Sequence, residues 1–357
     1  MRKASKTVYV GGIPVGGGNR VSIQSMTNTD TRDVKATLAQ IERLRAAGCD
    51  IVRLAVPDVD SAEAFGEIRR RCDVIPLVAD IHFDYRIALR CVELGADKIR
   101  INPGNIGGED RVAAVAGICR ERGIPIRIGV NGGSLEKDLR EKYRGATPEA
   151  LFESAMRHVS LLNAHDFDDI IISVKSSSVR DAVEANRYVA ANCDYPLHIG
   201  VTEAGSRRIG IIKNAEALGA LLPEGIGDTV RISLTDDPVE EVLAARDILR
   251  SLSMPGHAGM DIVSCPTCGR TKIDLIPLVA EFEKAAKKEG LLGIPVKVAI
   301  MGCVVNGPGE ASSADVGVAG GRGEALLFEH GRIVRKIPED MIISELVQYI
   351  KEKYVGR

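Results

Sequence analysis

The sequence lacks the features of a membrane protein or a secreted protein. No apolar run among its 357 residues approaches the ~20 residues that a membrane-spanning helix needs, although 45% of the residues are hydrophobic. The basic start, residues 1–6, leads into residues 7–12, which are too short and too broken by glycine to form the core of a signal peptide. We therefore expect a globular protein in the cytoplasm, with no membrane partner.

The sequence also lacks an excess of charge and a disulfide pattern. Its 47 lysine and arginine residues and 49 aspartate and glutamate residues give a net charge of −2, which argues against a nucleic-acid partner. Eight cysteines in so long a chain do not make a disulfide scaffold. A reducing compartment is consistent with them, because it keeps thiolates free to bind metal.

What the chain does contain, from residue 21 to about residue 250, is a repeated pattern of an amphipathic helix, a glycine near its end and a short apolar strand. The helical segment 34–47, for example, is followed by Gly48, and Thr147 and Pro148 are typical of a helix start. The eight predicted strands are residues 21–26, 51–56, 76–80, 98–101, 126–130, 170–175, 197–201 and 230–234.

Eight such units over about 230 residues favour a (β/α)8 TIM-like barrel, whose usual size is ~250 residues. The alternative is an open, doubly wound sheet, but no strand is followed by the GxGxxG fingerprint of dinucleotide-binding sheets. The glycines at 11–12 and 16–18 precede the first barrel strand and are typical of hairpin turns.

A second domain is predicted after the barrel. Residues 253–260 are small, contain proline and glycine and show no periodicity, so we interpret them as a linker between a barrel at 1–252 and a small α+β domain at 261–357. The elements expected in this domain are a strand leading into Cys265, a helix at 273–289, strands at 296–301, 316–319 and 325–328, and a last helix near 339–353.

This domain carries a candidate metal site made of Cys265, Cys268, Cys303 and Glu310. Soft sulfur ligands suit iron–sulfur clusters and zinc, whereas a carboxylate oxygen is a harder ligand that is displaced more easily. The glycines and prolines around Cys303 and Glu310 predict a loop with little side-chain bulk, which leaves room for a cluster.

Zinc and a redox pair remain as alternatives for this site. A CxxC pair occurs in structural zinc sites and in thiol–disulfide enzymes. A structural zinc site usually closes with four cysteine or histidine ligands, and the histidines of this region, His257 and His330, are distant in sequence. Iron–sulfur is therefore our first interpretation and zinc the second.

The barrel strands carry an unusual number of cations. Burying an unpaired charge costs several kcal/mol, so such side chains need internal carboxylates or an incoming anion. They could face solvent or pair with Asp97 or Asp228, but the acids near the predicted strand ends, Asp80 and Glu203, are fewer than the cations. A surplus of positive charge predicts a polyanionic ligand, and a diphosphate fits the planar fork of arginine. The five cations are Arg53, Arg100, Arg127, Lys175 and Arg231.

Polar side chains follow the predicted strands at the end where barrel enzymes place their chemistry. Asp80 and Glu203 are the best acid–base candidates among them. His198 lies within a strand and is expected to be a hydrogen-bonded core residue, and Asp236 and Asp237 are expected to cap a helix. The polar set is Gln24, Thr27, Asn28, Asp80, His82, Asn102, Asn131, Ser176, Thr202, Glu203 and Ser233, and the cysteines expected in the core are Cys49, Cys72, Cys91, Cys119 and Cys193.

With these residues in view, the chain resembles the 4-hydroxy-3-methylbut-2-enyl diphosphate synthase family of the methylerythritol phosphate route to isoprenoids. The resemblance runs nearly from end to end and rests on specific motifs. The chain lacks the long insertion of the plant form and is similar to the two-domain bacterial type. The motifs are SMTNT at 25–29, ADIHF at 79–83, RINPGN at 100–105, RIGVN at 127–131, VTEAG at 201–205, SCPTCGR at 264–270 and GCVVNGPGE at 302–310.

The resemblance implies a [4Fe–4S] cluster bound by Cys265, Cys268, Cys303 and Glu310. It also implies a substrate, 2-C-methyl-D-erythritol 2,4-cyclodiphosphate, which is opened and dehydrated with two electrons to a linear allylic diphosphate. The implied reacting end consists of Asp80, His82 and Glu203, and we hypothesise that Glu310 gives up its iron to a substrate oxygen. The implied diphosphate cradle consists of Arg53, Arg100, Arg127, Asn131, Lys175, Thr202, Arg231 and Ser233.

The implied partners are an electron donor and a second copy of the chain. The sequence shows no NAD, flavin or nucleotide fingerprint, so electrons must come from outside, and the resemblance implies reduced flavodoxin or ferredoxin. It also implies a head-to-tail homodimer in which the cluster domain of one protomer caps the barrel of its partner. Two alternatives are an iron–sulfur carrier whose barrel binds a phosphorylated regulator and a zinc-stabilised, aldolase-like barrel. The acid–base groups beside the cations favour an enzyme over a carrier.

Overall fold

The computed structural model describes residues 2–102, 105–304 and 312–355 and divides into two compact units. The units are Met1–Gly256 and His257–Arg357, so the division falls inside the segment 253–260. We describe each unit by itself.

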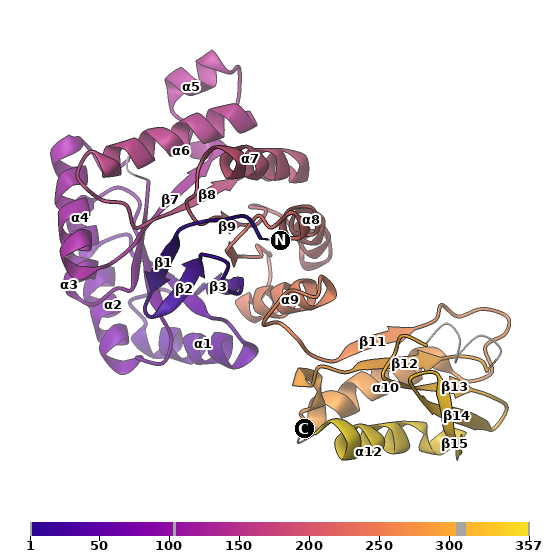
Figure 1. Cartoon of the computed structure of the whole chain (residues 1–357). Coiled ribbons are helices and arrows are strands. Elements are labelled where there is room, and N and C mark those ends of the chain that lie inside the picture. The colour runs from indigo at the N-terminus through magenta and orange to yellow at the C-terminus, as the bar shows by residue number, and fades with distance from the viewer. Residues whose placement is uncertain (1, 103–104, 305–311, 356–357) are drawn as a thin grey trace. The chain divides into compact units, whose positions relative to one another are not determined.

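The first unit is a barrel of parallel strands surrounded by helices (Figure 1). Its eight-stranded sheet has the order β8-β7-β6-β5-β4-β3-β10-β9, and a bridge between Ile172 and Leu197 joins the two ends. This closure confirms the predicted (β/α)8 class. The strands are β3 Ser22–Met26, β4 Ile51–Ala55, β5 Leu77–Asp80, β6 Lys98–Ile101, β7 Ile126–Asn131, β8 Ile170–Lys175, β9 His198–Ile199 and β10 Thr229–Val230.

The helices of this unit begin and end where the local sequence predicts. In α1 the side chain of Asp33 accepts a hydrogen bond from the Ala36 N–H, and Gly48 ends the helix in the left-handed region with φ 98°. None of the helices in the described ranges is both long enough and apolar enough to span a bilayer. The helices are α1 Val34–Ala47, α2 Val59–Arg71, α3 Tyr85–Glu93, α4 Glu109–Arg122, the short α5 Lys137–Lys142, α6 Pro148–Asn163, α7 Val179–Asn192, α8 Arg207–Leu221 and α9 Pro238–Ser251.

A hairpin covers the amino-terminal end of the barrel, as the glycines at 11–12 predict. Strands β1 Thr7–Val10 and β2 Ile13–Gly16 pair in antiparallel fashion. The apolar side chains of this hairpin pack against the first residues of the barrel strands, so this end of the barrel is filled. The cluster consists of Val8, Val10, Val15, Ile51, Val78 and Ile171.

At the same end of the barrel, three aspartates that immediately precede strands bind the backbone of the neighbouring strand. Asp50 accepts from the Ile23 N–H at 2.7 Å. Asp97 accepts from the Leu77 N–H at 2.8 Å, and Asp228 accepts from the Leu197 N–H at 2.8 Å. Each carboxylate thereby satisfies a backbone donor that the sheet leaves unpaired.

All three aspartates are also engaged by arginines from outside the strands, and Asp50 pairs with Arg20. Asp97 pairs with Arg69 at 3.4 Å and Asp228 with Arg2 at 2.6 Å. Burial raises the pKa of both carboxyls. The idea that Asp97 or Asp228 neutralises the strand cations is therefore wrong.

The last two barrel strands are shorter than predicted. Strands were expected at 197–201 and 230–234, but β9 and β10 end at Ile199 and Val230, so Ser233 lies beyond its strand. Gly200 explains the early end, because its φ of 144° leaves extended geometry and a Cβ there would lie 2.1 Å from the carbonyl oxygen of Arg231. The segments that contain Gly200 and Arg231 thus lie very close together at this point, where regular strand pairing ends.

The second unit is a mixed sheet with helices packed on it (Figure 1). Its order is β11-β12-β13-β14-β15, with β11 to β13 parallel and the last two strands antiparallel. Asp315 repeats the arrangement of the barrel aspartates, because it precedes β13 and accepts from the Lys297 N–H of β12 at 2.8 Å. The elements are β11 Asp261–Ser264, β12 Lys297–Met301, β13 Val316–Gly320, β14 Glu324–Glu329, β15 Arg332–Pro338, α10 Leu275–Lys288 and α12 Ile342–Tyr354.

Strand β15 was missed by the sequence analysis. Its first five residues are all exposed, so it shows none of the alternation between buried and exposed positions that marks a strand. The predicted helix near 339–353 also begins later, because Glu339–Met341 forms a 3-10 turn before α12.

We expect Asp228→Ala to lower the stability of the barrel by about 2 kcal/mol, because it leaves the buried Leu197 N–H without its acceptor. The midpoint of urea unfolding, followed by circular dichroism, measures the change. Asp247→Ala is the matched control, since that aspartate is 66% exposed and its pairing with Arg250 is worth about 0.5 kcal/mol or less. Equal midpoints for the two variants would contradict the assigned role.

Candidate active site

All five predicted strand cations line one cavity at the carboxyl-terminal end of the barrel strands. The cavity has a volume of about 90 Å³. In the sheet Arg100 lies opposite Arg127, and Asn131 lies opposite Lys175. The structure thus brings together residues that are far apart in the sequence. The lining residues are Arg53, Arg100, Arg127, Gly129, Val130, Asn131, Ser173, Lys175, Thr202 and Arg231.

A sixth strand cation, Lys98, was not counted among the candidates. It is fully buried on β6, and its Nζ donates to the Gln24 Oε1 at 3.0 Å. Burial, with Arg127 and Arg53 nearby, holds the pKa of Lys98 well below its ordinary value. The signal was visible in the sequence, because Lys98 and Arg100 occupy alternate positions of one short strand.

Asp80 is a counterion for two of these arginines. It is 3% exposed, and its Oδ1 accepts from Arg100 Nη1 at 3.2 Å while its Oδ2 lies 3.6 Å from Arg53 Nε. Burial favours the neutral acid, but the charges of Arg53 and Arg100 outweigh it and hold the pKa of Asp80 below its ordinary value. Asp80 is therefore ionised at neutral pH and cannot donate a proton there.

A second buried carboxylate, Glu241, was missed. It lies on α9, is 4% exposed and is 3.3 Å from Arg231. A glutamate in an amphipathic helix is normally taken for a solvent-facing residue, so only its place on the buried face of α9 could have marked it.

The two carboxylates do not balance the cations. Asp80 pairs with Arg53 and Arg100, and Glu241 pairs with Arg231. Within the described part of the chain, Arg127 and Lys175 form no ion pair with a carboxylate. Burial and the neighbouring cations hold the pKa values of both well below their ordinary values.

Three arginines of the cavity also keep an unused hydrogen-bond donor. The Nε atoms of Arg100, Arg127 and Arg231 are buried and have no partner among the described residues. A buried donor without an acceptor costs about 1–3 kcal/mol. Unpaired cations and unused donors at one cavity are the arrangement expected of a site that is completed by an anion.

Glycine at position 129 makes room for one of these arginines. A Cβ at Gly129 would lie 2.8 Å from the Nε of Arg100 and 2.9 Å from its Nη2. The guanidinium of Arg100 therefore lies directly against the backbone of β7.

The remaining polar candidates lie around the cavity rather than in its lining. His82 is half-exposed, and its Nε2 is 3.8 Å from Asp80 Oδ2. Ser233 accepts from Arg231 Nη1 at 2.6 Å. Glu203 is exposed and has a φ of 51°, a left-handed conformation that costs a non-glycine residue about 1–2 kcal/mol. Strain of this kind is frequent at functional sites, so it is consistent with a chemical role for Glu203.

His198 differs from its expected role. It is fully buried, as predicted for a core residue, but neither ring nitrogen has a hydrogen-bond partner among the described residues. Burial and the surrounding cations hold the pKa of His198 well below its ordinary value, so the ring is neutral. The other minor expectations hold in part: Asp237 caps α9, whereas Asp236 accepts from the Asp237 N–H, and four of the five remaining cysteines are buried, whereas Cys193 is partly exposed.

The candidate metal ligands of the second unit follow neighbouring strands. Cys265 comes directly after β11 and Cys303 two residues after β12, and these strands are paired through Ser264 and Ile300. Cys265 Sγ accepts a hydrogen bond from the Gly302 N–H at 3.2 Å. Glu310 lies outside the described residues.

The surroundings of the cysteines suit thiolate ligands. A backbone hydrogen bond from Arg270, with help from its side chain, holds the pKa of Cys268 below its ordinary value. Hydrogen bonds from N–H groups to cysteine sulfur are also typical of iron–sulfur sites. No group of three potential metal ligands is gathered within the described ranges.

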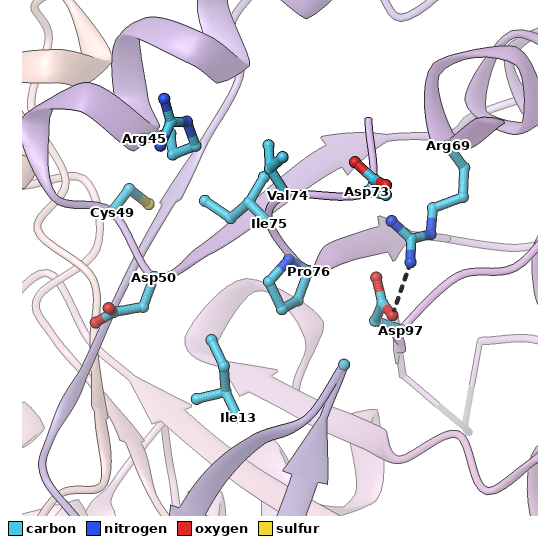
Figure 2. Close-up of a pocket in the computed structure, with 11 residues that line it drawn as sticks. Ile13, Arg45, Cys49, Asp50, Arg69, Asp73, Val74, Ile75, Pro76 and Asp97 are labelled. Carbon is cyan, nitrogen blue, oxygen red and sulfur yellow. Dashed lines mark hydrogen bonds and ion pairs between the residues drawn. The ribbon is translucent and has the colours of Figure 1, made fainter. Parts of the chain in front are cut away.

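A second hollow, of about 340 Å³, lies at the opposite end of the barrel (Figure 2). Its two arginines are already used by the protein, and one of them, Arg45, pairs with Glu42. Arg69 binds Asp97 and donates to the carbonyl oxygens of Gly95 and Cys72 at 3.0 and 2.7 Å, while Asp97 holds the Leu77 N–H. The hollow therefore lacks the unused donors that mark the first cavity.

The chain matches two protein-family models. One, described as the GcpE TIM-barrel domain, matches residues 5–246, and the other, described as the GcpE protein C-terminal domain, matches residues 261–352. Curated relatives named 4-hydroxy-3-methylbut-2-en-1-yl diphosphate synthase (flavodoxin) are similar over their full length. The protein of Ruminiclostridium cellulolyticum is 56% identical over 98% of each chain. That of Geobacillus thermodenitrificans is 54% identical over 100% of this chain and 95% of its own.

Solved structures add only the fold. Dihydropteroate synthase from Stenotrophomonas maltophilia superposes with a TM-score of 0.50 and 14% identity, covering 70% of this chain and 97% of its own. The enzyme from Xanthomonas albilineans gives a TM-score of 0.50 and 15% identity, over 70% and 98% of the two chains. At this identity the likeness concerns the barrel architecture alone.

We expect Gly129→Ala to weaken binding of inorganic pyrophosphate by about tenfold, because the new methyl group displaces the guanidinium of Arg100 and one charge-assisted hydrogen bond is lost. Isothermal titration calorimetry of the full chain measures the affinity. Gly117→Ala is the control, since a Cβ at that glycine meets nothing within 4 Å. If both variants bind pyrophosphate as the unsubstituted chain does, Arg100 does not contact the anion.

Proposed function

The chain belongs to the GcpE family, and we propose that it catalyses the reaction for which its curated relatives are named, with flavodoxin as the electron donor. The substrate is 2-C-methyl-D-erythritol 2,4-cyclodiphosphate, and the product is 4-hydroxy-3-methylbut-2-en-1-yl diphosphate of the isoprenoid route. One observation carries the proposal: the buried cavity of the barrel has more cations than carboxylates and keeps three unused arginine donors.

The diphosphate is proposed to bind in this cavity. Arg127 and Lys175 have no described carboxylate as a partner, and an anion bound beside them would offset the burial and repulsion that lower their pKa values and so favour their charged forms. Arg100 and Arg231 supply their unused Nε donors. The complete proposed cradle is the predicted one, Arg53, Arg100, Arg127, Asn131, Lys175, Thr202, Arg231 and Ser233.

The reacting end is proposed to lie beside Asp80, His82 and Glu203. In the reaction a ring C–O bond breaks, its oxygen stays on the diphosphate, and a hydroxyl group leaves as water after receiving a proton. Asp80 is held ionised by Arg53 and Arg100, so it organises the cations and supplies no proton at neutral pH. We assign the proton transfer to Glu203, which is exposed at the rim in a strained conformation.

The cofactor is proposed to be a [4Fe–4S] cluster held by Cys265, Cys268, Cys303 and Glu310. The support from this chain is the chemistry of its donors, namely the Gly302 N–H on Cys265 and the lowered pKa of Cys268. When bound, such a cluster supplies the two electrons one at a time. Iron content and a brown colour of the anaerobically purified protein, rather than bound zinc, are the expected readouts.

We further propose an electron-donor partner, a homodimer and a cytoplasmic location. Flavodoxin is favoured over ferredoxin by the names of the relatives. A head-to-tail homodimer is proposed from the family resemblance, and the mass of the protein in solution checks the dimer. A cytoplasmic location is supported by eight cysteines that all remain free thiols. The near-neutral net charge supports the absence of a nucleic-acid partner.

Anaerobic turnover of the cyclic diphosphate with reduced flavodoxin tests the function. The linear allylic diphosphate is the expected product, detected by mass spectrometry, and its absence with protein that contains its full complement of iron would overturn the proposal.

Within the same assay, we expect Glu203→Gln to lower kcat by about 100-fold or more while changing KM little, because it removes a proton donor and leaves the cations in place. Glu224→Gln, an exposed glutamate paired with Arg187, is the control. A Glu203→Gln variant with unchanged kcat would show that the proton comes from another group.

A further inference from the structure

Glu241 occupies an unusual position for a helix glutamate. It lies one turn into α9, on the face directed at the barrel, and is 4% exposed. A buried carboxylate is costly unless it is fully hydrogen-bonded. Glu241 meets this condition with three donors: its Oε2 accepts from Ser25 Oγ at 2.9 Å, and its Oε1 accepts from the Leu234 N–H at 3.0 Å and from Arg231 Nη2 at 3.3 Å.

These contacts lie where the last strand of the barrel meets the first. Strands β10 and β3 are paired only at Thr229–Ser22 and Val230–Ile23. Strand β10 ends at Val230, and the next residue still bonds to β9, since the Arg231 N–H donates to the Ile199 carbonyl oxygen at 3.1 Å. Glu241 supplies a connection on the β3 side, because one carboxylate joins Ser25 of β3 to Leu234 of the segment that follows β10.

The same carboxylate fixes the orientation of Arg231. Nη1 of this arginine donates to Ser233 Oγ at 2.6 Å, and Nη2 donates to Glu241. The planar guanidinium is thereby held at both ends. Its third nitrogen, Nε, is buried without a partner among the described residues, in a side chain that lines the anion cavity.

We propose that Glu241 is a positioning residue that holds Arg231 in the orientation in which its Nε–H can bind the anionic ligand. The proposal rests on the proposed function of the cavity as a diphosphate site. The proposal also predicts the direction in which anion affinity changes when the charge of Glu241 is removed. If Glu241 acted only as a counterion, removing its charge would tighten anion binding, because the cavity would gain net positive charge. If it positions Arg231, removing its charge weakens anion binding.

The experiment compares Glu241→Gln with Glu240→Gln in the full chain, with inorganic pyrophosphate as the probe in isothermal titration calorimetry. Glutamine can still accept from the Leu234 N–H and bind Ser25, so the fold is kept, but its uncharged oxygen holds Arg231 by a weaker hydrogen bond than the charge-assisted one of glutamate. We expect about tenfold weaker binding for Glu241→Gln. Glu240 is the neighbouring residue of the same helix, and its carboxylate pairs with Arg207 at 2.5 Å, so its variant should bind as the unsubstituted chain does. Tighter or unchanged binding by Glu241→Gln would overturn the proposal.

A double-mutant cycle separates positioning from a general structural role. In an Arg231→Ala background, Glu241→Gln should cause no further loss of pyrophosphate affinity, because the side chain through which it acts is absent. Additive losses would contradict the proposal. If Glu241→Gln does not fold, Ser25→Ala is the second variant: it removes one hydrogen bond, keeps the charge and should weaken binding about threefold. Unchanged affinity in a folded Ser25→Ala protein would then overturn the proposal.

Failure of this inference can be told apart from failure of the proposed function. If the unsubstituted chain binds no pyrophosphate, the cavity is not an anion site and both are overturned. If pyrophosphate binds but the cycle shows no coupling, only the role of Glu241 is lost. If coupling is found and the cyclic diphosphate is not converted, the positioning role stands and the assigned reaction does not.

Discussion

The structure depends on positive charge buried inside the barrel without equal negative charge. Six cations lie on or directly after the strands, and two buried carboxylates, Asp80 and Glu241, face them. Burial and mutual repulsion lower the pKa of Arg53 to about 10 and hold that of Lys175 well below its ordinary value. The anion that we propose for this cavity would relieve the repulsion among these cations.

The distribution of hydrogen bonds keeps this charge available. The aspartates that could have neutralised the strand cations are used at the opposite end of the barrel, where they bind backbone N–H groups. Arg53 is steadied by the uncharged Met26, whose sulfur accepts from Nη2 at 2.8 Å. A thioether orients a guanidinium without cancelling its charge. At Arg53 the orienting sulfur and the carboxylate thus belong to different residues, Met26 and Asp80, whereas at Arg231 the carboxylate of Glu241 supplies both the hydrogen bond and the negative charge.

Much of this site could be predicted from the sequence because charge in an apolar strand is a strong local signal. Arg100 and Arg127 stand out in their strands, and the barrel brings them together whatever the loops do. Glu241 could not be predicted, because in a helix its burial depends on which face packs against the strands. The ends of the last two strands were also predicted wrongly. They depend on the close approach of Gly200 to Arg231, which neither segment shows in its own sequence. Asp80 was predicted as an acid–base candidate, but its ionised state could not be, because it depends on Arg53 and Arg100, which folding brings close.

The aspartates that precede strands occur in both units of the protein. Asp50, Asp97 and Asp228 in one unit and Asp315 in the other stand immediately before a strand and accept the first free N–H of the adjacent parallel strand. Since the two units have different topologies, the arrangement belongs to the parallel edge itself and not to either fold. Such an aspartate marks the start of its own strand and, through its hydrogen bond, ties that strand to one particular neighbour. In a sheet built from distant segments, such a carboxylate therefore adds one hydrogen bond that is made only when the correct two strands lie side by side in the correct alignment.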